Sequence, residues 1–171
     1  ASLAYLMIPK VECRADVERA CAHIDAAAQQ AGHDTPIPVQ VLIESPAAVH
    51  QAFDIASHPR VESVSFGLMD FVSAHGGAIP AQAMGVRGAS DATTLDQFHH
   101  PLVVRAKLEI ASACHAHGKV PSHCVVTEFR DPAVLQQAAR QAARALGYTR
   151  MWSIHPDQIR PILQAFAPEP A

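Results

Sequence analysis

The sequence predicts an α/β protein built on a parallel sheet, and three observations lead to this fold class. Short apolar runs of strand length alternate with longer stretches of helical period. The runs are nearly continuous in apolar residues, as in strands buried on both faces of a parallel sheet. Strict alternation of strands and helices is the pattern that produces such sheets. With 171 residues, the chain has the length of one ordinary domain.

Five apolar runs are the predicted strands. Pro9-Lys10 closes the first run, Glu44 ends the second, and Gly67 ends the third. Their lengths of four to eight residues are typical of strands. The predicted strands are residues 4–8, 39–43, 61–66, 120–126 and 149–154.

Five stretches between and after these runs are the predicted helices: residues 16–31, 47–56, 102–117, 131–146 and 157–165. In the fourth, Asp131 is a plausible N-cap, Pro132 takes the first helical position, and Gly147 follows the end. Residues 71–100 show no long period and are predicted to form a loop. Because this segment follows the third strand, we expect it over the carboxyl edge of the sheet, where α/β proteins keep their sites.

The composition excludes several classes of partner and location. The net charge is −3 and no basic patch is visible, so a nucleic-acid partner is not expected. No apolar run approaches the roughly 20 residues that span a bilayer, so no membrane segment is expected. The four cysteines form no CxxC pair and indicate buried thiols in a reducing compartment, the cytoplasm.

Two acidic residues follow neighbouring predicted strands. Glu44 ends the second strand and Asp70 lies just beyond the third. Successive parallel strands lie about 5 Å apart, so the two carboxylates can meet at one point, where they repel each other. A divalent cation relieves this repulsion, and Mg²⁺ is suited to two carboxylates plus water and substrate oxygens. The spacing also allows each acid simply to cap the next helix.

Four motifs resemble those of one known family. The runs LMIPKVE, VLIESPAAV, VSFGLMDFV and MWSIHPDQI, in this order, are similar to the citrate lyase beta-subunit-like and HpcH/HpaI aldolase family. The resemblance implies a (β/α)₈ TIM barrel that cleaves or forms a carbon–carbon bond beside a carboxylate or thioester. It also implies that Glu44 and Asp70 are ligands of Mg²⁺ or Mn²⁺, and that the metal stabilises an enolate.

The resemblance extends to the substrate and the assembly. It implies that the backbone amides of Gly67, Leu68, Met69 and Asp70 hold the substrate carboxylate or carbonyl. A simple strand stop is the alternative interpretation of Gly67. The implied substrate is a 2-oxo acid or an acyl-CoA thioester, and the implied assembly is a homo-oligomer, a trimer or a hexamer.

The family barrel has eight strands, whereas this chain offers five. The resemblance assigns them as barrel strands 4–8, so residues 1–171 are expected to be the C-terminal part of a single barrel domain. Five strands alone would leave unpaired edges and an open sheet face. The substrate-binding arginine of the family lies outside these residues, and no catalytic base can be assigned.

Four further residues carry two interpretations each. His123 lies where many relatives have an Asp-Gly pair, and is either a proton carrier or metal ligand or a buried structural side chain. His155 either belongs to the site or marks a strand-to-helix junction. His75, before two glycines, either approaches a ligand or lies in a flexible loop. Arg87 either binds an anion or is a solvated loop charge.

The leading functional hypothesis is therefore a Mg²⁺-dependent carbon–carbon lyase. The alternative is a non-catalytic or degenerate barrel subunit with a role in assembly. A barrel enzyme that uses phosphoenolpyruvate chemistry is the third hypothesis.

Overall fold

The computed structural model of the chain describes residues 3–86 and 93–168. It is an α/β fold with one five-stranded sheet, in which every adjacent pair is parallel. The strands lie side by side in chain order, β1-β2-β3-β4-β5. Their bounds are β1 Leu6–Ile8, β2 Val39–Ile43, β3 Val61–Phe66, β4 Val120–His123 and β5 Arg150–Met151.

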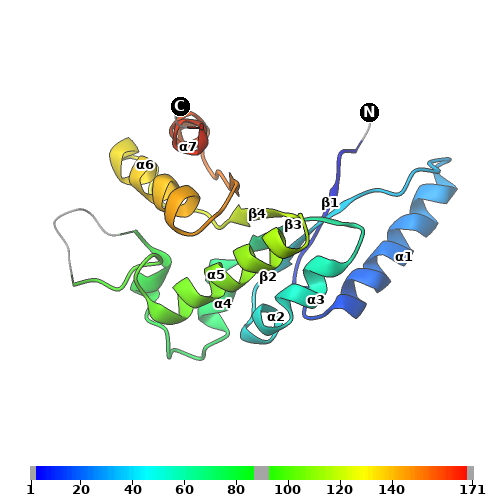
Figure 1. The fold of residues 1–171 in the computed structure, drawn as a ribbon, viewed down its shortest axis with the longest axis horizontal. Helices are drawn as coiled ribbons and strands as arrows, with labels where there is room; N and C mark the ends of the chain where they lie inside the picture. Colours follow the sequence, from blue (N-terminus) through cyan, green and yellow to red (C-terminus); the bar gives the residue numbers. More distant parts are fainter. Residues whose placement is uncertain (1–2, 87–92, 169–171) are drawn as a thin grey trace.

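The helices follow the strands along the chain. The α-helices are α1 Arg14–Gln30, α2 Pro46–His50, α3 Ala52–Ser57, α4 Leu68–Ser73, α5 Pro101–Ala116, α6 Pro132–Arg140 and α7 Ile159–Phe166. Three shorter turns of helix are η1 Ala81–Met84, η2 Gln141–Ala145 and η3 Pro156–Gln158. In Figure 1, α1, α2, α3 and α5 lie along one side of β1–β4, and α6 and α7 lie beyond β4.

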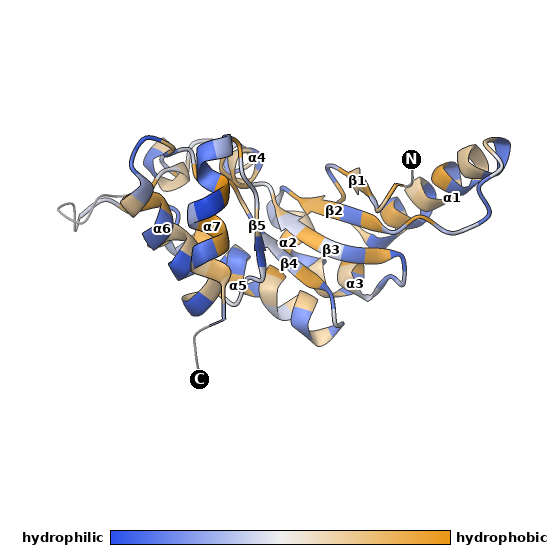
Figure 2. Cartoon of the chain, turned by 90° about the horizontal axis from the view of Figure 1, so that it is seen from above, coloured by the Kyte–Doolittle hydropathy of each residue, from blue (hydrophilic) through white to orange (hydrophobic). Residues whose placement is uncertain are grey.

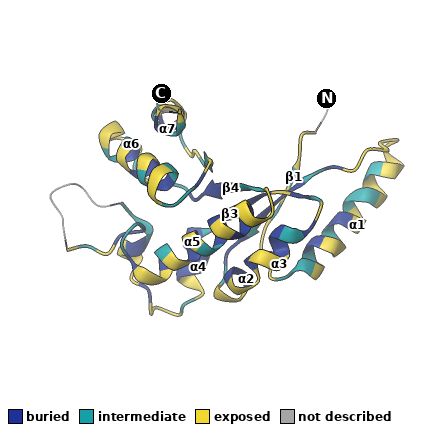
Figure 3. Ribbon diagram, in the orientation of Figure 1, coloured by how far each residue is buried: buried dark blue, intermediate teal, exposed yellow. Residues whose placement is uncertain are grey.

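Apolar stripes on the helices bury against the strands. In α5, Val103, Ala106 and Ile110 recur at helical spacing and are all at most 1% exposed, as this stripe predicts. They join Ile55 of α3 and Val64 of β3 in the largest core cluster. Figure 3 shows buried residues concentrated along the strands and in the parts of the helices next to them.

The opposite face of the sheet differs from the sequence prediction of apolar burial on both faces. Figure 2 shows β2 and β3 from above, where no helix crosses them and polar positions interrupt the apolar ones. Gln40 Nε2 and Trp152 Nε1 both donate to Ser65 Oγ, at 2.6 and 3.0 Å. A hollow of about 340 Å³ adjoins this face. The helices α1, α2, α3 and α5 therefore cover one side of the sheet, and polar side chains from different strands bond to each other on the other side.

The predicted bounds of β2 and β3 are confirmed, but the outer strands are shorter than expected. The first and last predicted strands shrink to Leu6–Ile8 and Arg150–Met151 because each is an edge strand with a single hydrogen-bonded neighbour in the described sheet. The fourth ends at His123, three residues before the predicted end.

The predicted loop and three of the predicted helices need correction. Residues 71–100 are not one loop, because α4 covers Leu68–Ser73 and η1 covers Ala81–Met84. The helix predicted over 47–56 is divided at Gln51, whose ψ of 5° departs from helical geometry. The helix predicted over 131–146 ends in a π-turn, in which Leu146 N–H donates to the Gln141 carbonyl at 3.2 Å. Its predicted cap is confirmed, since Asp131 accepts from two amides of the first turn.

The last predicted helix, 157–165, begins instead with the 3₁₀ turn η3 and continues as α7. Among the residues that the structure describes, no helix combines the length and apolar character needed to cross a lipid bilayer.

Candidate functional site

The carboxyl edge of the sheet holds Glu44 in a fixed position. Glu44 directly follows β2 and is 9% exposed. Its Oε2 accepts from the Lys10 amide at 2.9 Å, and Lys10 lies two residues beyond the end of β1. On the other side, Glu44 packs against the Gly67 backbone at the end of β3. Residues that follow β1 and β3 thus hold the carboxyl group that follows β2.

Asp70 reaches the same point from a different element. It lies in the first turn of α4, the short helix that follows β3, and its side chain is 54% exposed. Its Oδ2 is 3.3 Å from the Lys10 ammonium. The structure therefore brings together the two acids that the sequence singled out, with a lysine contacting both.

The electrostatics of Glu44 reflect this crowding. Burial raises the pKa of its carboxyl above the ordinary value, and the negative charge and a hydrogen bond of Asp70 raise it further. The Lys10 amide and ammonium oppose both effects. Two carboxyl groups this close favour a cation between them, because a cation replaces their repulsion with attraction.

Gly67 is required for a reason that the sequence did not reveal. A Cβ on Gly67 would lie 2.4 Å from Glu44 Cγ and 2.7 Å from Glu44 Oε1. Its φ of −91° is open to any residue, so the missing side chain, and not backbone freedom, is what matters. Its amide donates to the Ile43 carbonyl at 2.8 Å. The resemblance implied that four amides bind the substrate, but the amide of Gly67 is already hydrogen-bonded to the neighbouring strand. Those of Leu68, Met69 and Asp70 open α4, where amides have no acceptor within the helix.

A hollow of about 210 Å³ adjoins the two acids. Its apolar lining includes Leu42, Phe66 and Trp152, and Glu44 and Asp70 also line it. Within residues 3–86 and 93–168, no three His, Cys, Asp or Glu side chains gather to hold a metal by themselves. Two carboxylates fit Mg²⁺ nonetheless, because this ion commonly takes one or two protein carboxylates and fills its other positions with water and substrate oxygens.

A buried polar network lies behind the hollow, and the sequence analysis missed it. Lys107 of α5 is fully buried, and its Nζ donates to Gln97 Oε1 at 2.9 Å. Cys124, which lines the hollow, contacts the same oxygen through its thiol at 3.3 Å. The ammonium also lies 4.2 Å from the centre of the Phe98 ring. Desolvation lowers the pKa of Lys107 to about 8.

His123 has the surroundings of a structural side chain. It is 0% exposed, its ring stacks on Phe98 at 5.4 Å, and Tyr148 meets its edge at 4.9 Å. Its Nδ1 pairs with the Cys124 carbonyl at 2.9 Å. Desolvation and the nearby Lys107 charge hold the pKa of His123 well below its usual value, so the ring is neutral.

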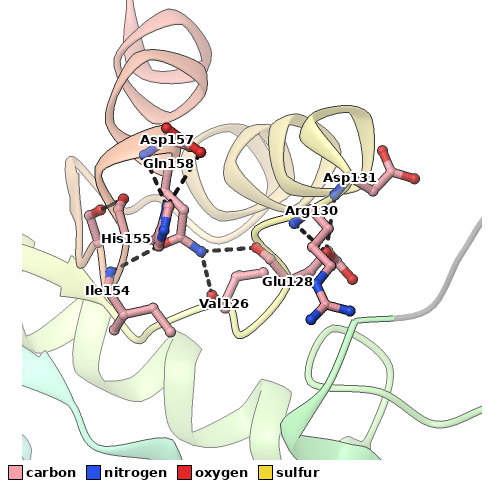
Figure 4. A network of polar contacts seen from close by, with 9 residues as sticks. Val126, Glu128, Arg130, Asp131, Ile154, His155, Asp157 and Gln158 are labelled. Atoms are coloured by element: carbon pink, nitrogen blue, oxygen red, sulfur yellow. Dashed lines mark hydrogen bonds and ion pairs between the residues drawn. The ribbon is translucent and has the colours of Figure 1, made fainter.

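His155 lies at a junction between two loops of the carboxyl edge, shown in Figure 4. Its Nδ1 accepts from the Asp157 amide at 3.3 Å, which caps the turn η3. Beside it, Gln158 donates to the carbonyls of Val126 and Glu128 at 2.8 and 2.9 Å and accepts from the Ile154 amide. The bonds of Gln158 join the loop after β4 to the loop after β5. The position of His155 as N-cap of η3 is what a strand-to-helix junction requires.

His75 is placed by the structure, whereas Arg87 is not. His75 Nδ1 pairs with the Phe71 carbonyl at 2.7 Å, and the glycines after it turn the chain with φ of 58° and 89°. His75 therefore lies just beyond the end of α4, at Ser73, and its ring pairs with a carbonyl of the last turn. Arg87 lies outside the described residues.

Comparison with known proteins matches this geometry to one family. The family described as HpcH/HpaI aldolase/citrate lyase matches residues 1–156. An L-malyl-CoA/beta-methylmalyl-CoA lyase of Cereibacter sphaeroides is 31% identical over 95% of this chain and 51% of its own length. A citrate lyase subunit beta-like protein of Deinococcus radiodurans is 25% identical over 99% of this chain and 51% of its own.

Solved structures with a similar fold include a citrate lyase and a citrate lyase beta subunit. The crystal structure of a citrate lyase from Burkholderia xenovorans is 52% identical and superposes with a TM-score of 0.89, over 97% of this chain and 49% of that one. The citrate lyase beta subunit of Mycobacterium tuberculosis, complexed with oxaloacetate and magnesium, shares the fold at 24% identity. Its TM-score is 0.73, over 98% of this chain and 63% of that one. The chain spans about half the length of the curated relatives it matches.

The close approach of Glu44 to Gly67 generates the first prediction. Gly67→Ala places a methyl group 2.4 Å from Glu44 Cγ and forces the side chain away from the Lys10 amide. We expect a loss of about 1–3 kcal/mol in the free energy of unfolding, measured by urea denaturation. Gly85→Ala is the control, because its nearest contact would be an ordinary 3.5 Å. Equal losses of unfolding free energy in the two variants would contradict the steric role of Gly67 beside Glu44.

Lys107 generates a pH prediction. Its folded pKa of about 8 lies below its ordinary value of 10.5, so the unfolded chain binds the proton more tightly between these values. The contribution of Lys107 to the free energy of unfolding should therefore rise with pH across this interval, by up to about 3 kcal/mol relative to a variant without the ammonium. The Cys21, Cys114 and Cys124 thiols, whose pKa values burial raises, act in the opposite direction in wild type and variant alike. Urea denaturation of the wild type and of Lys107→Met at several pH values isolates this contribution. If the variant shows the same rise, another group is responsible.

Proposed function

This chain belongs to the HpcH/HpaI aldolase/citrate lyase family, and we propose that it carries the metal-binding part of a Mg²⁺-dependent carbon–carbon lyase. Glu44 and Asp70 hold the ion, Mg²⁺ or Mn²⁺. The observation that carries the proposal is the convergence of these two carboxyl groups at the carboxyl edge of a parallel sheet, where Lys10 contacts both.

The residues around the acids suit this chemistry. The Lys10 amide and the Gly67 backbone orient Glu44, and the first turn of α4 presents Asp70. The amides of Leu68, Met69 and Asp70 bind the substrate carboxylate or carbonyl, and the apolar walls of the hollow exclude water. When bound, the metal supplies Lewis-acid stabilisation of the negative charge that develops when a bond beside a carbonyl is cleaved. The substrate class is a 2-oxo acid or an acyl-CoA thioester.

We further propose that the chain is five consecutive βα units, strands 4–8, of a (β/α)₈ barrel. Three features support this. The strands follow one another in chain order, the helices cover one side of the sheet, and the relatives are about twice as long. Residues 1–171 are then the C-terminal part of one barrel domain, with the substrate-binding arginine in the preceding units. A homo-oligomer, trimer or hexamer, is the proposed assembly, and the four free thiols suit the cytoplasm.

Metal binding tests the central proposal. Glu44→Gln and Asp70→Asn each remove one negative ligand at nearly constant shape, so we expect Mn²⁺ affinity to fall on the order of 100-fold or more. The affinity is measured by the electron paramagnetic resonance signal of free Mn²⁺ with the native polypeptide. Glu62→Gln, an exposed acid at the other end of β3, serves as the control and should leave affinity unchanged.

Failure of the wild type to bind Mn²⁺ or Mg²⁺ would favour the alternative, a non-catalytic or degenerate subunit that keeps the fold for assembly. If the metal binds, assays with 2-oxo acid aldols and with acyl-CoA esters separate the two substrate classes.

The barrel proposal predicts a mass. The intact native polypeptide should weigh well above 18.3 kDa by mass spectrometry, because three more units are needed to close the sheet. A native mass of 18.3 kDa would contradict the proposal.

A further inference from the structure

Lys10 has an unusual backbone conformation. Within residues 3–86 and 93–168 it is the one residue other than glycine with positive φ, at 53°. This left-handed conformation is unfavourable for an L-amino acid with a side chain, and it persists only where the surroundings impose it. Pro9 precedes it with a rigid ring, and Val11 follows it, 1% exposed, with its amide bonded to the Leu42 carbonyl. The left-handed turn lets the Lys10 amide meet Glu44 Oε2 at 2.9 Å.

The Lys10 side chain has a different role from its backbone. Its ammonium lies 3.3 Å from Asp70 Oδ2, and it is 70% exposed. An exposed ion pair of this kind contributes little to stability and is easily broken. The ammonium nevertheless places one positive charge beside the two acids and lowers the pKa of Glu44.

We propose that Lys10 is a positioning residue with two separable parts, a fixed amide that orients Glu44 and a displaceable ammonium that serves as counter-ion of Asp70 until a divalent cation binds. This inference rests on the proposed function, because it takes Glu44 and Asp70 as the ligands. In the free site the ammonium relieves the repulsion between the carboxylates and so preserves their arrangement. It also competes with the incoming ion, since like charges repel, and a flexible exposed side chain can move into solvent.

The two parts predict opposite effects on metal affinity. Removing the ammonium removes a competing charge, so the divalent ion should bind more tightly. Because the ammonium is exposed and screened by salt, the effect is modest, about threefold to tenfold. Loss of the backbone arrangement would instead weaken binding. A lysine that only maintained local structure could not produce tighter binding on removal.

The experiment measures Mn²⁺ dissociation constants by electron paramagnetic resonance on the native polypeptide, at low and high KCl. Lys10→Met should lower the dissociation constant threefold to tenfold at low salt, and the gain should shrink at high salt. Lys10→Arg keeps the charge and should match the wild type. Arg105→Met, which breaks a comparable exposed ion pair with Glu109 on α5, is the control and should change nothing.

A dissociation constant for Lys10→Met equal to or higher than that of the wild type would overturn the counter-ion role. Absence of Mn²⁺ binding by the wild type would overturn the proposed function itself, so the two failures are distinguishable.

Lys10→Gly tests the backbone conformation that orients the amide. Glycine keeps the N–H and adopts positive φ readily. This variant should therefore bind Mn²⁺ as tightly as Lys10→Met, and its melting temperature should equal or exceed that of Lys10→Met. Weaker Mn²⁺ binding by Lys10→Gly than by Lys10→Met would contradict the inference that the surroundings of residue 10, and not its side chain, fix the amide.

Discussion

The site depends on the confinement of one carboxyl group, that of Glu44. It is nearly buried, it accepts from the Lys10 amide, and it fills the space that a side chain on Gly67 would take. Burying a carboxylate is unfavourable without compensation. The compensation visible in the fold comes from the amide and ammonium of Lys10, beyond the end of β1, and Gly67 at the end of β3 leaves the space that the side chain fills. The orientation of Glu44 is therefore a property of the sheet and not of one loop.

The order of the strands explains why these groups can meet. In a parallel sheet with strands in chain order, every strand delivers its carboxyl end to the same edge. Register then matters, because Ile43 pairs with Phe66 and the next residues, Glu44 and Gly67, lie side by side. Each connecting loop needs to contribute only one or two groups. Gln158 adds a second constraint by joining the loops after β4 and β5 beside the hollow.

Much of the strand arrangement and the pair of acids could be predicted from the sequence. The bounds of β2 and β3 were predicted correctly because their apolar runs are continuous and end at Glu44 and Gly67. The helix α4 was missed because six residues are too short to show a helical period. The role of Gly67 depends on the register between β2 and β3, which cannot be predicted from the local sequence. The burial of Lys107 depends on tertiary packing near Cys124, which cannot be predicted from it either. The positive φ of Lys10 could not be predicted either, because a lysine rarely adopts this conformation and nothing in its local sequence indicates it.

The most direct measurement is the anomalous scattering of Mn²⁺ in crystals of the native polypeptide, recorded at the manganese absorption edge. We expect one strong peak within bonding distance of a Glu44 and an Asp70 oxygen, with the Lys10 ammonium moved away from Asp70. A strong peak elsewhere, with the Lys10 ammonium still paired to Asp70, would contradict it.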